Sequence, residues 1–123
     1  KITSALNRHK KAINGSTILF LGVAYKPDID DERESPALKI IDEVINKGGN
    51  VQFHDPFIPR INTPGNNQLE GIELSQDSLN NADCVVITTN HSAFDAGFIE
   101  KNSRMIVDLR NLIKTATDKV YKL

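Results

Sequence analysis

The sequence has 123 residues, of which 25% are charged and 39% hydrophobic, and its formal net charge is −1 at pH 7. That length predicts one domain with a substantial core, and the charge balance argues against a nucleic-acid-binding protein, which usually carries a basic excess. The sequence has no apolar run near the roughly 18 residues of a membrane-spanning helix, and its single cysteine fits a cytoplasmic protein.

Apolar residues recur at helical spacing over 1–15 until Asn14-Gly15 stops the pattern. This segment predicts a short helix that leads into the rest of the chain. The apolar run that follows predicts a buried strand over 17–23.

A polar segment from Gly22 to Ala37, GVAYKPDIDDERESPA, separates this strand from a helix predicted over 36–47. Ser35 is a good N-cap, and Pro36 suits the first helical turn. The order of strand, polar loop and helix N-terminus places the segment at the carboxyl edge of a sheet, where open α/β folds bind ligands.

Lys26 and Arg33 lie in this polar segment, beside the free N–H groups of the helix start, and this combination suits an anionic ligand such as phosphate. After Gly22 the next glycine is Gly48, so the segment is neither a dinucleotide-binding fingerprint nor a Walker A loop. The alternative is a solvated loop whose own charges pair with one another.

The rest of the chain alternates between strand and helix patterns. Strands are expected over 51–54, 83–89, 105–109 and, at the edge, 120–123, with a brief strand or turn over 72–74. Helices are expected over 75–81 and 92–101. The second of these helices should have Phe94, Phe98 and Ile99 facing inward. The proline- and glycine-rich segment 56–71 predicts an exposed, mobile surface loop. These patterns predict an α/β fold, a Rossmann-like, doubly wound, mostly parallel sheet of four or five strands with helices on both faces.

In that sheet the strands at 17–23, 83–89 and 105–109 are expected to be neighbours, with 51–54 beyond the first. Their carboxyl ends then bring Tyr25, Lys26, residues 89–91 and Arg110 to one rim. Lys26 and Arg110 could clamp a pyrophosphate, Arg110 with its planar fork and Lys26 as a point charge. The alternative is that each pairs with a loop carboxylate.

Other polar residues carry weaker signals. Asp55 ends the second strand, where a Rossmann acid would hold a ribose, but an Asp-Pro turn is the favoured interpretation. His91 is interpreted as a loop-capping residue, and Cys84 as an inert core thiol with a raised pKa. No cluster of histidine, cysteine and carboxylates has metal-ligand spacing.

The polar segment closely resembles the signature of the C-terminal domain of the UDP-glucose/GDP-mannose dehydrogenase family. Its Tyr25, Pro27 and 33–37 run is most similar to the UDP-N-acetylhexosamine 6-dehydrogenases. Further matching segments follow the family order: Lys10-Lys11-Ala12-Ile13-Asn14-Gly15, His54-Asp55-Pro56, Ala82-Asp83 with Thr89-Asn90-His91, and Val107-Asp108-Leu109-Arg110-Asn111.

The resemblance implies an NAD-dependent enzyme that oxidises the C6 alcohol of a UDP-sugar to a carboxylate in two steps, making UDP-uronic acids for polysaccharide biosynthesis. Tyr25, Lys26 and Arg110 would bind the UDP-sugar, with UDP-N-acetylglucosamine or UDP-N-acetylmannosamine favoured, and Arg33 would reach the cofactor. The catalytic cysteine and the cofactor fingerprint of the family belong to other domains. The resemblance therefore implies no catalytic residue in this chain and no activity when it is isolated.

The resemblance also implies how the chain is divided. Residues 1–15 would end a connecting helix from a preceding domain, and 16–123 would form the UDP-sugar-binding domain. The parent would be a homodimer or a larger oligomer, in which this domain contacts the rest of its own polypeptide.

A different class remains open from the pattern alone, a non-catalytic signalling or interaction module with a flavodoxin-like fold. A phospho-receiver would want an acidic cluster directly after the first strand and an aspartate at the end of the third main strand. Here the first strand leads into 22–26 and the third ends in 88–90, which counts against that interpretation.

Overall fold

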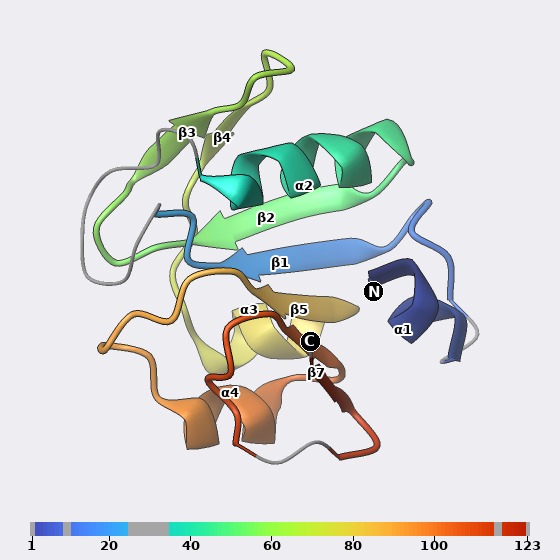
Figure 1. The fold of residues 1–123 in the computed structure, drawn as a ribbon, viewed down its shortest axis with the longest axis vertical. Helices are drawn as coiled ribbons and strands as arrows, with labels where there is room; N and C mark the ends of the chain where they lie inside the picture. Colours follow the sequence, from blue (N-terminus) through green and yellow to red (C-terminus); the bar gives the residue numbers. More distant parts are fainter. Residues whose placement is uncertain (1, 9–10, 25–34, 115–116, 123) are drawn as a thin grey trace.

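The computed structural model describes residues 2–8, 11–24, 35–114 and 117–122 (Figure 1). Its elements in chain order are α1 (Ile2–Arg8), β1 (Thr17–Leu21), α2 (Pro36–Asn46), β2 (Asn50–His54), β3 (Arg60–Asn62), β4 (Gln68–Glu70), α3 (Gln76–Asn81), β5 (Cys84–Ile87), α4 (Ala96–Asn102), β6 (Ile106–Asp108) and β7 (Val120–Lys122). None of the helices in this described part has the length and apolarity that a membrane crossing requires.

The main sheet has the strand order β2-β1-β5-β6-β7, and every neighbouring pair is parallel. The predicted order is therefore confirmed, including the edge strand near the C-terminus. From β1 the chain moves to β2 on one side and returns to β5 on the other. The carboxyl ends of β1 and β5 thus form the switch point of the sheet, where open α/β folds bind ligands.

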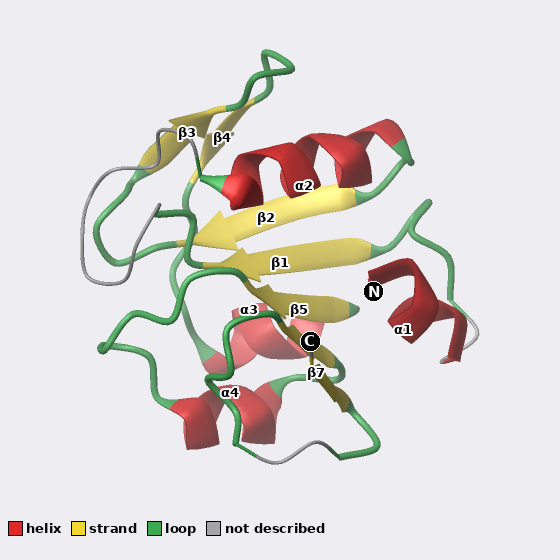
Figure 2. Cartoon of the chain, in the orientation of Figure 1, coloured by secondary structure: helices red, strands yellow, loops and turns green. Residues whose placement is uncertain are grey.

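Helices cover both faces of this sheet, as predicted (Figure 2). Alternate residues of β1 point to opposite faces: Ile18 and Phe20 pack in the buried cluster that includes residues of α1 and α2, and Leu19 and Leu21 in the cluster that includes residues of α3 and α4. These four side chains are fully buried, and only Thr17 at the start of β1 is not. Burial on both faces explains why the parallel strands read as continuous apolar runs.

The first helix packs against the sheet rather than standing away from it. Ala5 and Leu6 of α1 are fully buried in the same cluster as Ile18. Lys11 then forms an ion pair with Asp83 at 3.0 Å, next to the start of β5. The boundary between 1–15 and 16–123 stays a prediction.

Several element boundaries differ from the sequence prediction: β5, for example, spans Cys84–Ile87 rather than 83–89. Two of the differences have a clear local cause. β1 ends at Leu21, because Gly22 adopts a φ of +83° and the chain leaves the ladder there. α4 begins at Ala96 rather than 92, because Asp95 is its N-cap and accepts a hydrogen bond from Phe98 N at 3.1 Å. With that start, Phe98 faces outward and 38% of its surface is exposed, so the expectation that it faces inward is wrong. Phe94 and Ile99 are buried, as expected.

The segment 56–71, predicted as an exposed, mobile surface loop, is mostly exposed but is more than a loop, and its mobility stays a prediction. This segment contains the antiparallel hairpin β3–β4, and Ile58, Ile61 and Thr63 in it are buried. Asp42 of α2 holds the hairpin in place, because its carboxylate accepts hydrogen bonds from Thr63 Oγ1 and, at 2.7 Å, from Asn67 Nδ2.

Candidate functional site

The switch point is built on a close approach of two backbones. An ideal Cβ on Gly22 would lie 2.5 Å from Thr89 Cβ and 2.6 Å from the Thr89 carbonyl oxygen. Only glycine fits there, and its positive φ is also one that other residues rarely adopt. Thr88 Oγ1 donates to the carbonyl of Gly22, and Thr89 Oγ1 donates to the carbonyl of Ala24 at 2.8 Å, which ties the two strand ends together.

Asp55 binds the chain that leaves β1. One carboxylate oxygen, Oδ2, accepts hydrogen bonds from the backbone N–H groups of Val23 at 2.8 Å and Ala24 at 3.2 Å. The other, Oδ1, accepts from Phe57 N at 2.8 Å. The last contact confirms the turn after β2, and the first two give Asp55 a further role that the sequence analysis missed.

His91 completes this arrangement from the opposite side of β1. Its Nε2 lies 2.9 Å from Asp55 Oδ2, and both side chains are fully buried. Because a carboxylate only accepts, Nε2 carries the proton of this hydrogen bond. The ring centroids of Phe57 and Phe94 lie 5.1 Å and 5.4 Å from the centroid of the imidazole. The ring of His91 is therefore fixed in the core of the rim, in addition to any role of its backbone in the loop.

Arg110 lies at the same edge, directly after β6. Its Nε donates a hydrogen bond to the carbonyl of Thr88 at 3.0 Å, which places the base of the exposed guanidinium at the end of β5. Its backbone N–H donates to the buried carboxylate of Asp108 at 3.0 Å, and that carboxylate also accepts from Ile113 N at 2.7 Å. These contacts hold the chain that carries Arg110 against the sheet.

The structure thus places part of the predicted site and not all of it. Arg110 and residues 89–91 lie at the carboxyl rim as expected, since Arg110 bonds to Thr88, the residue before Thr89, and Thr89 bonds to Ala24. The start of α2 also agrees, since Ser35 Oγ accepts from Ala37 N at 3.3 Å. Tyr25, Lys26 and Arg33 lie outside the described residues.

Cys84 does not contribute a nucleophile. Burial raises the pKa of its thiol to about 12, with a smaller contribution from the negative charge of Asp83. The thiol is therefore protonated at physiological pH, which agrees with the prediction of a core thiol with a raised pKa, and its inertness stays a prediction. Within the described ranges, no group of histidine, cysteine and carboxylate side chains could hold a metal ion.

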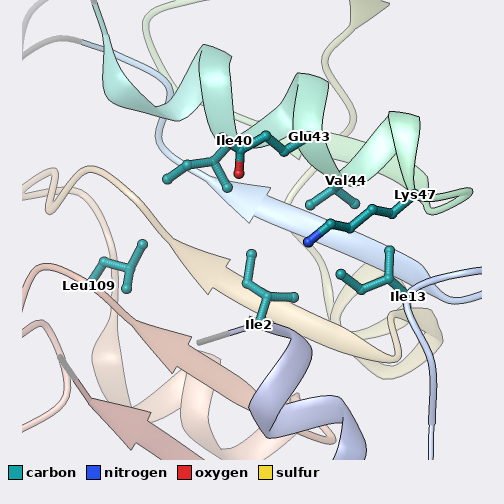
Figure 3. A pocket seen from close by; sticks show the side chains of 7 residues that line it. All are labelled: Ile2, Ile13, Ile40, Glu43, Val44, Lys47 and Leu109. Carbon is teal, nitrogen blue, oxygen red and sulfur yellow. The ribbon is translucent and has the colours of Figure 1, made fainter.

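An open groove of about 250 Å³ lies between α1 and α2, on one face of the sheet, and reaches Leu109 next to Arg110 (Figure 3). Its walls are mainly aliphatic: Ile2, Ile13, Ile40, Val44 and Leu109, with Glu43 and Lys47 at the lip. A diphosphate needs several hydrogen-bond donors, and this lining supplies a single cation opposed by a carboxylate. The polar rim is therefore the better candidate site.

The model of the UDP-glucose/GDP-mannose dehydrogenase family, UDP binding domain, matches residues 19–115. The chain belongs to this family. The match spans the switch point, the Asp55–His91 pair and Arg110. It supports nucleotide-sugar binding over the signalling module considered from the sequence.

Named relatives agree with the family assignment. The chain is 33% identical to a UDP-glucose 6-dehydrogenase of Rickettsia bellii, over 93% of this chain and 27% of that protein. It is 35% identical to a UDP-N-acetyl-D-mannosamine dehydrogenase of Pyrococcus horikoshii, over 79% of this chain and 22% of that protein. The chain therefore spans about a quarter of the length of these family members.

Solved structures confirm the fold. A UDP-D-ManNAc dehydrogenase from Pyrococcus horikoshii superposes with a TM-score of 0.78 at 27% identity, over 98% of this chain and 28% of that one. An NDP-N-acetyl-D-galactosaminuronic acid dehydrogenase from Methanosarcina mazei gives 0.75 at 32% identity, over 92% and 24%. The Rossmann-like architecture predicted from the sequence is that of a domain in these enzymes.

Proposed function

We propose that this chain is the nucleotide-sugar-binding C-terminal domain of an NAD-dependent UDP-sugar 6-dehydrogenase. The parent enzyme would oxidise the C6 alcohol of the sugar to a carboxylate in two hydride transfers, and UDP-N-acetylglucosamine and UDP-N-acetylmannosamine are the favoured substrates. The observation that carries the proposal is the position of Arg110 at the switch point of a chain that matches the family's UDP binding domain.

Arg110 and Lys26 would hold the diphosphate, and Tyr25 would contribute contacts near the nucleotide. Support for Arg110 comes from its Nε contact with the Thr88 carbonyl, which leaves the rest of an exposed guanidinium to meet phosphate oxygens. A planar guanidinium suits such oxygens because it can donate two parallel hydrogen bonds.

NAD would be bound mainly outside this chain, with Arg33 reaching toward it. The described residues do not fit a dinucleotide site. Asp55, placed where a Rossmann acid holds a ribose, already accepts from Val23, Ala24, Phe57 and His91. Hydride acceptance, the chemistry that NAD supplies, is thus assigned to the parent enzyme and not to this domain.

Catalysis would also lie elsewhere in the parent. Cys84 is buried with a pKa of about 12, and His91 is sequestered against Asp55, so neither is placed to attack a substrate or to relay a proton to one. The parent would be a cytoplasmic homodimer or a larger assembly. In it, residues 1–15 would end the connecting helix, and 16–123 would form one wall of the cleft.

The test is a titration of the chain with UDP and with GDP. Nuclear magnetic resonance monitors binding through the chemical shifts of the backbone amides. One wall of a cleft leaves the ligand largely solvated, so we expect a dissociation constant for UDP on the order of millimolar. Replacing Lys26 and Arg110 together by alanine should abolish the binding without unfolding the domain. Lys101→Ala, on the exposed surface of α4, is the control that should leave it unchanged.

Two results would contradict the proposal. One is UDP binding that survives the double substitution. The other is reduction of NAD by the chain alone with a UDP-sugar, because that would place the missing catalytic groups within these 123 residues.

A further inference from the structure

We propose that Asp55 and His91 form a positioning pair that fixes the backbone of Val23 and Ala24 at the end of β1 and thereby sets the affinity of the nucleotide site. The inference rests on the proposed function, because it assigns a role within the same rim. Neither side chain is proposed to touch the ligand.

The pair joins three segments that are distant in the sequence. Asp55 follows β2, His91 follows β5, and the two meet beside the residues that follow β1, between those strands. The carboxylate accepts from both N–H groups of Val23 and Ala24, and Nε2 of His91 holds the same oxygen, Oδ2, at 2.9 Å. The imidazole therefore determines where that oxygen lies relative to both amides.

Ala24 is also held on its carbonyl side, and Gly22, just before Val23, is held through its N–H group. Thr89 Oγ1 donates to the carbonyl of Ala24 at 2.8 Å, while Gly22 N donates to the carbonyl of His54 at 2.9 Å. The backbone that leaves β1 is thus fixed by contacts from both neighbouring strands. Tyr25 and Lys26 come next in the sequence, so the direction in which the chain approaches them is fixed at Ala24.

Burying the carboxylate of Asp55 at the rim costs free energy, which a strand end without a buried charge would avoid. A fully buried carboxylate is destabilising unless hydrogen bonds satisfy its oxygens. Asp55 recovers that cost through three backbone N–H groups and one imidazole. Removing the imidazole donor would leave the charge under-satisfied and free to move, so the two amides of Val23 and Ala24 would lose their fixed acceptor.

The experiment compares three variants of the chain by titration with UDP. His91→Leu keeps a similar volume without a donor, Asp55→Asn removes the charge, and His91→Gln keeps a side-chain N–H. We expect His91→Leu and Asp55→Asn to weaken UDP binding about tenfold, the change that corresponds to one lost hydrogen bond. His91→Gln should regain most of the affinity.

A spectroscopic readout separates positioning from general stability. In the unmodified chain the amide protons of Val23 and Ala24 should resonate downfield, as expected for hydrogen bonds to a carboxylate, and should shift on addition of UDP. In His91→Leu both should move upfield before any ligand is added. The matched control is Leu79→Ala in α3, which removes a fully buried core side chain outside the pair and should lower stability without changing the affinity for UDP.

The outcomes distinguish this inference from the proposed function. If the unmodified chain does not bind UDP, both fail. If UDP binds but His91→Leu and Asp55→Asn weaken it no more than Leu79→Ala, the pair is structural only and the inference alone is overturned. Should those two variants not fold, the unmodified chain still decides, because UDP that leaves the Val23 and Ala24 amides unmoved also overturns it.

Discussion

Arg110 reaches across from β6 and donates a hydrogen bond from Nε to the backbone carbonyl of Thr88, 3.0 Å away at the end of β5. One side chain thereby joins the ends of β5 and β6, next to the switch point between β1 and β5. The contact uses Nε and leaves the terminal nitrogens at the exposed end of the side chain. That division of donors is available to arginine and not to lysine.

Arg110→Lys should therefore weaken UDP binding by about threefold to tenfold, because lysine keeps the charge but cannot hold the Thr88 carbonyl and two phosphate oxygens at once. The free energy of unfolding should change by less than about 1 kcal/mol, since the side chain is exposed. Titration with UDP and urea unfolding measure the two quantities. Arg104→Lys, at the opposite edge of the sheet beside Asp83, is the matched control. If Arg110→Lys weakened UDP binding no more than Arg104→Lys, the guanidinium of Arg110 would have no special role in the site.

Gly22→Ala should be strongly destabilising, because the new Cβ would meet Thr89 backbone and side-chain atoms at 2.5–2.6 Å and φ is positive. Conformational strain of about 1–2 kcal/mol and overpacking of about 1–3 kcal/mol should both lower the free energy of unfolding. Gly15→Ala separates the two effects, since Gly15 has a φ of +85° with nothing within 4 Å of an added Cβ. Urea unfolding of both variants gives the comparison. A loss at Gly22 no larger than that at Gly15 would contradict the close approach.

Asp42→Asn should make the free energy of unfolding less sensitive to a fall in pH. Burial alone would raise the pKa of Asp42, but hydrogen bonds from Thr63, Asn67 and Gly65 outweigh it and hold the pKa below its usual value of 3.8. The carboxylate therefore stabilises the fold above that value, and this contribution disappears as the pH falls through the lowered pKa.

The variant should then lose about 1 kcal/mol at neutral pH, and this difference from the unmodified chain should shrink as the pH falls below 3.8. Urea unfolding at several pH values measures it, with Glu43→Gln on the exposed surface of α2 as the control. A difference that grows in acid would have the wrong sign for a lowered pKa.

Cys84 should resist alkylation in the folded chain. Burial raises the pKa of its thiol to about 12, so both the thiolate fraction and access are low. At about pH 8 iodoacetamide should react at least about a hundredfold more slowly with the folded chain than with the chain unfolded in urea. Mass spectrometry follows the modification. Similar rates in the two states would show that β5 opens readily.

Local patterns in the sequence were enough for the main sheet and its helices. Strands buried on both faces must be apolar throughout, so β1 and β5 stand out as runs, and Ser35-Pro36 marks the start of α2. Alternation of strand and helix then leaves few topologies, because crossovers between parallel strands are right-handed and short. The same reasoning placed Arg110 at the rim, since it follows directly after a strand.

The hairpin β3–β4 could not be read from its sequence in the same way. Its strands are three residues long and mostly polar, and prolines and glycines surround them, so propensity favours a loop. What orders the hairpin is the carboxylate of Asp42 in another element, through contacts more than 20 residues away in the sequence.

The sequence by itself determined which segments form the strands of the main sheet, because an apolar run is a local property. Only the tertiary structure decided which residues at the strand ends meet. Asp55 and His91 follow strands on either side of β1, a placement that the predicted strand order already contained, yet each has a satisfactory local interpretation as a turn or a cap. The two residues are 36 positions apart, so their pairing depends on the path of the chain between them and on burial, which removes water as a competing partner. Neither leaves a pattern in the sequence.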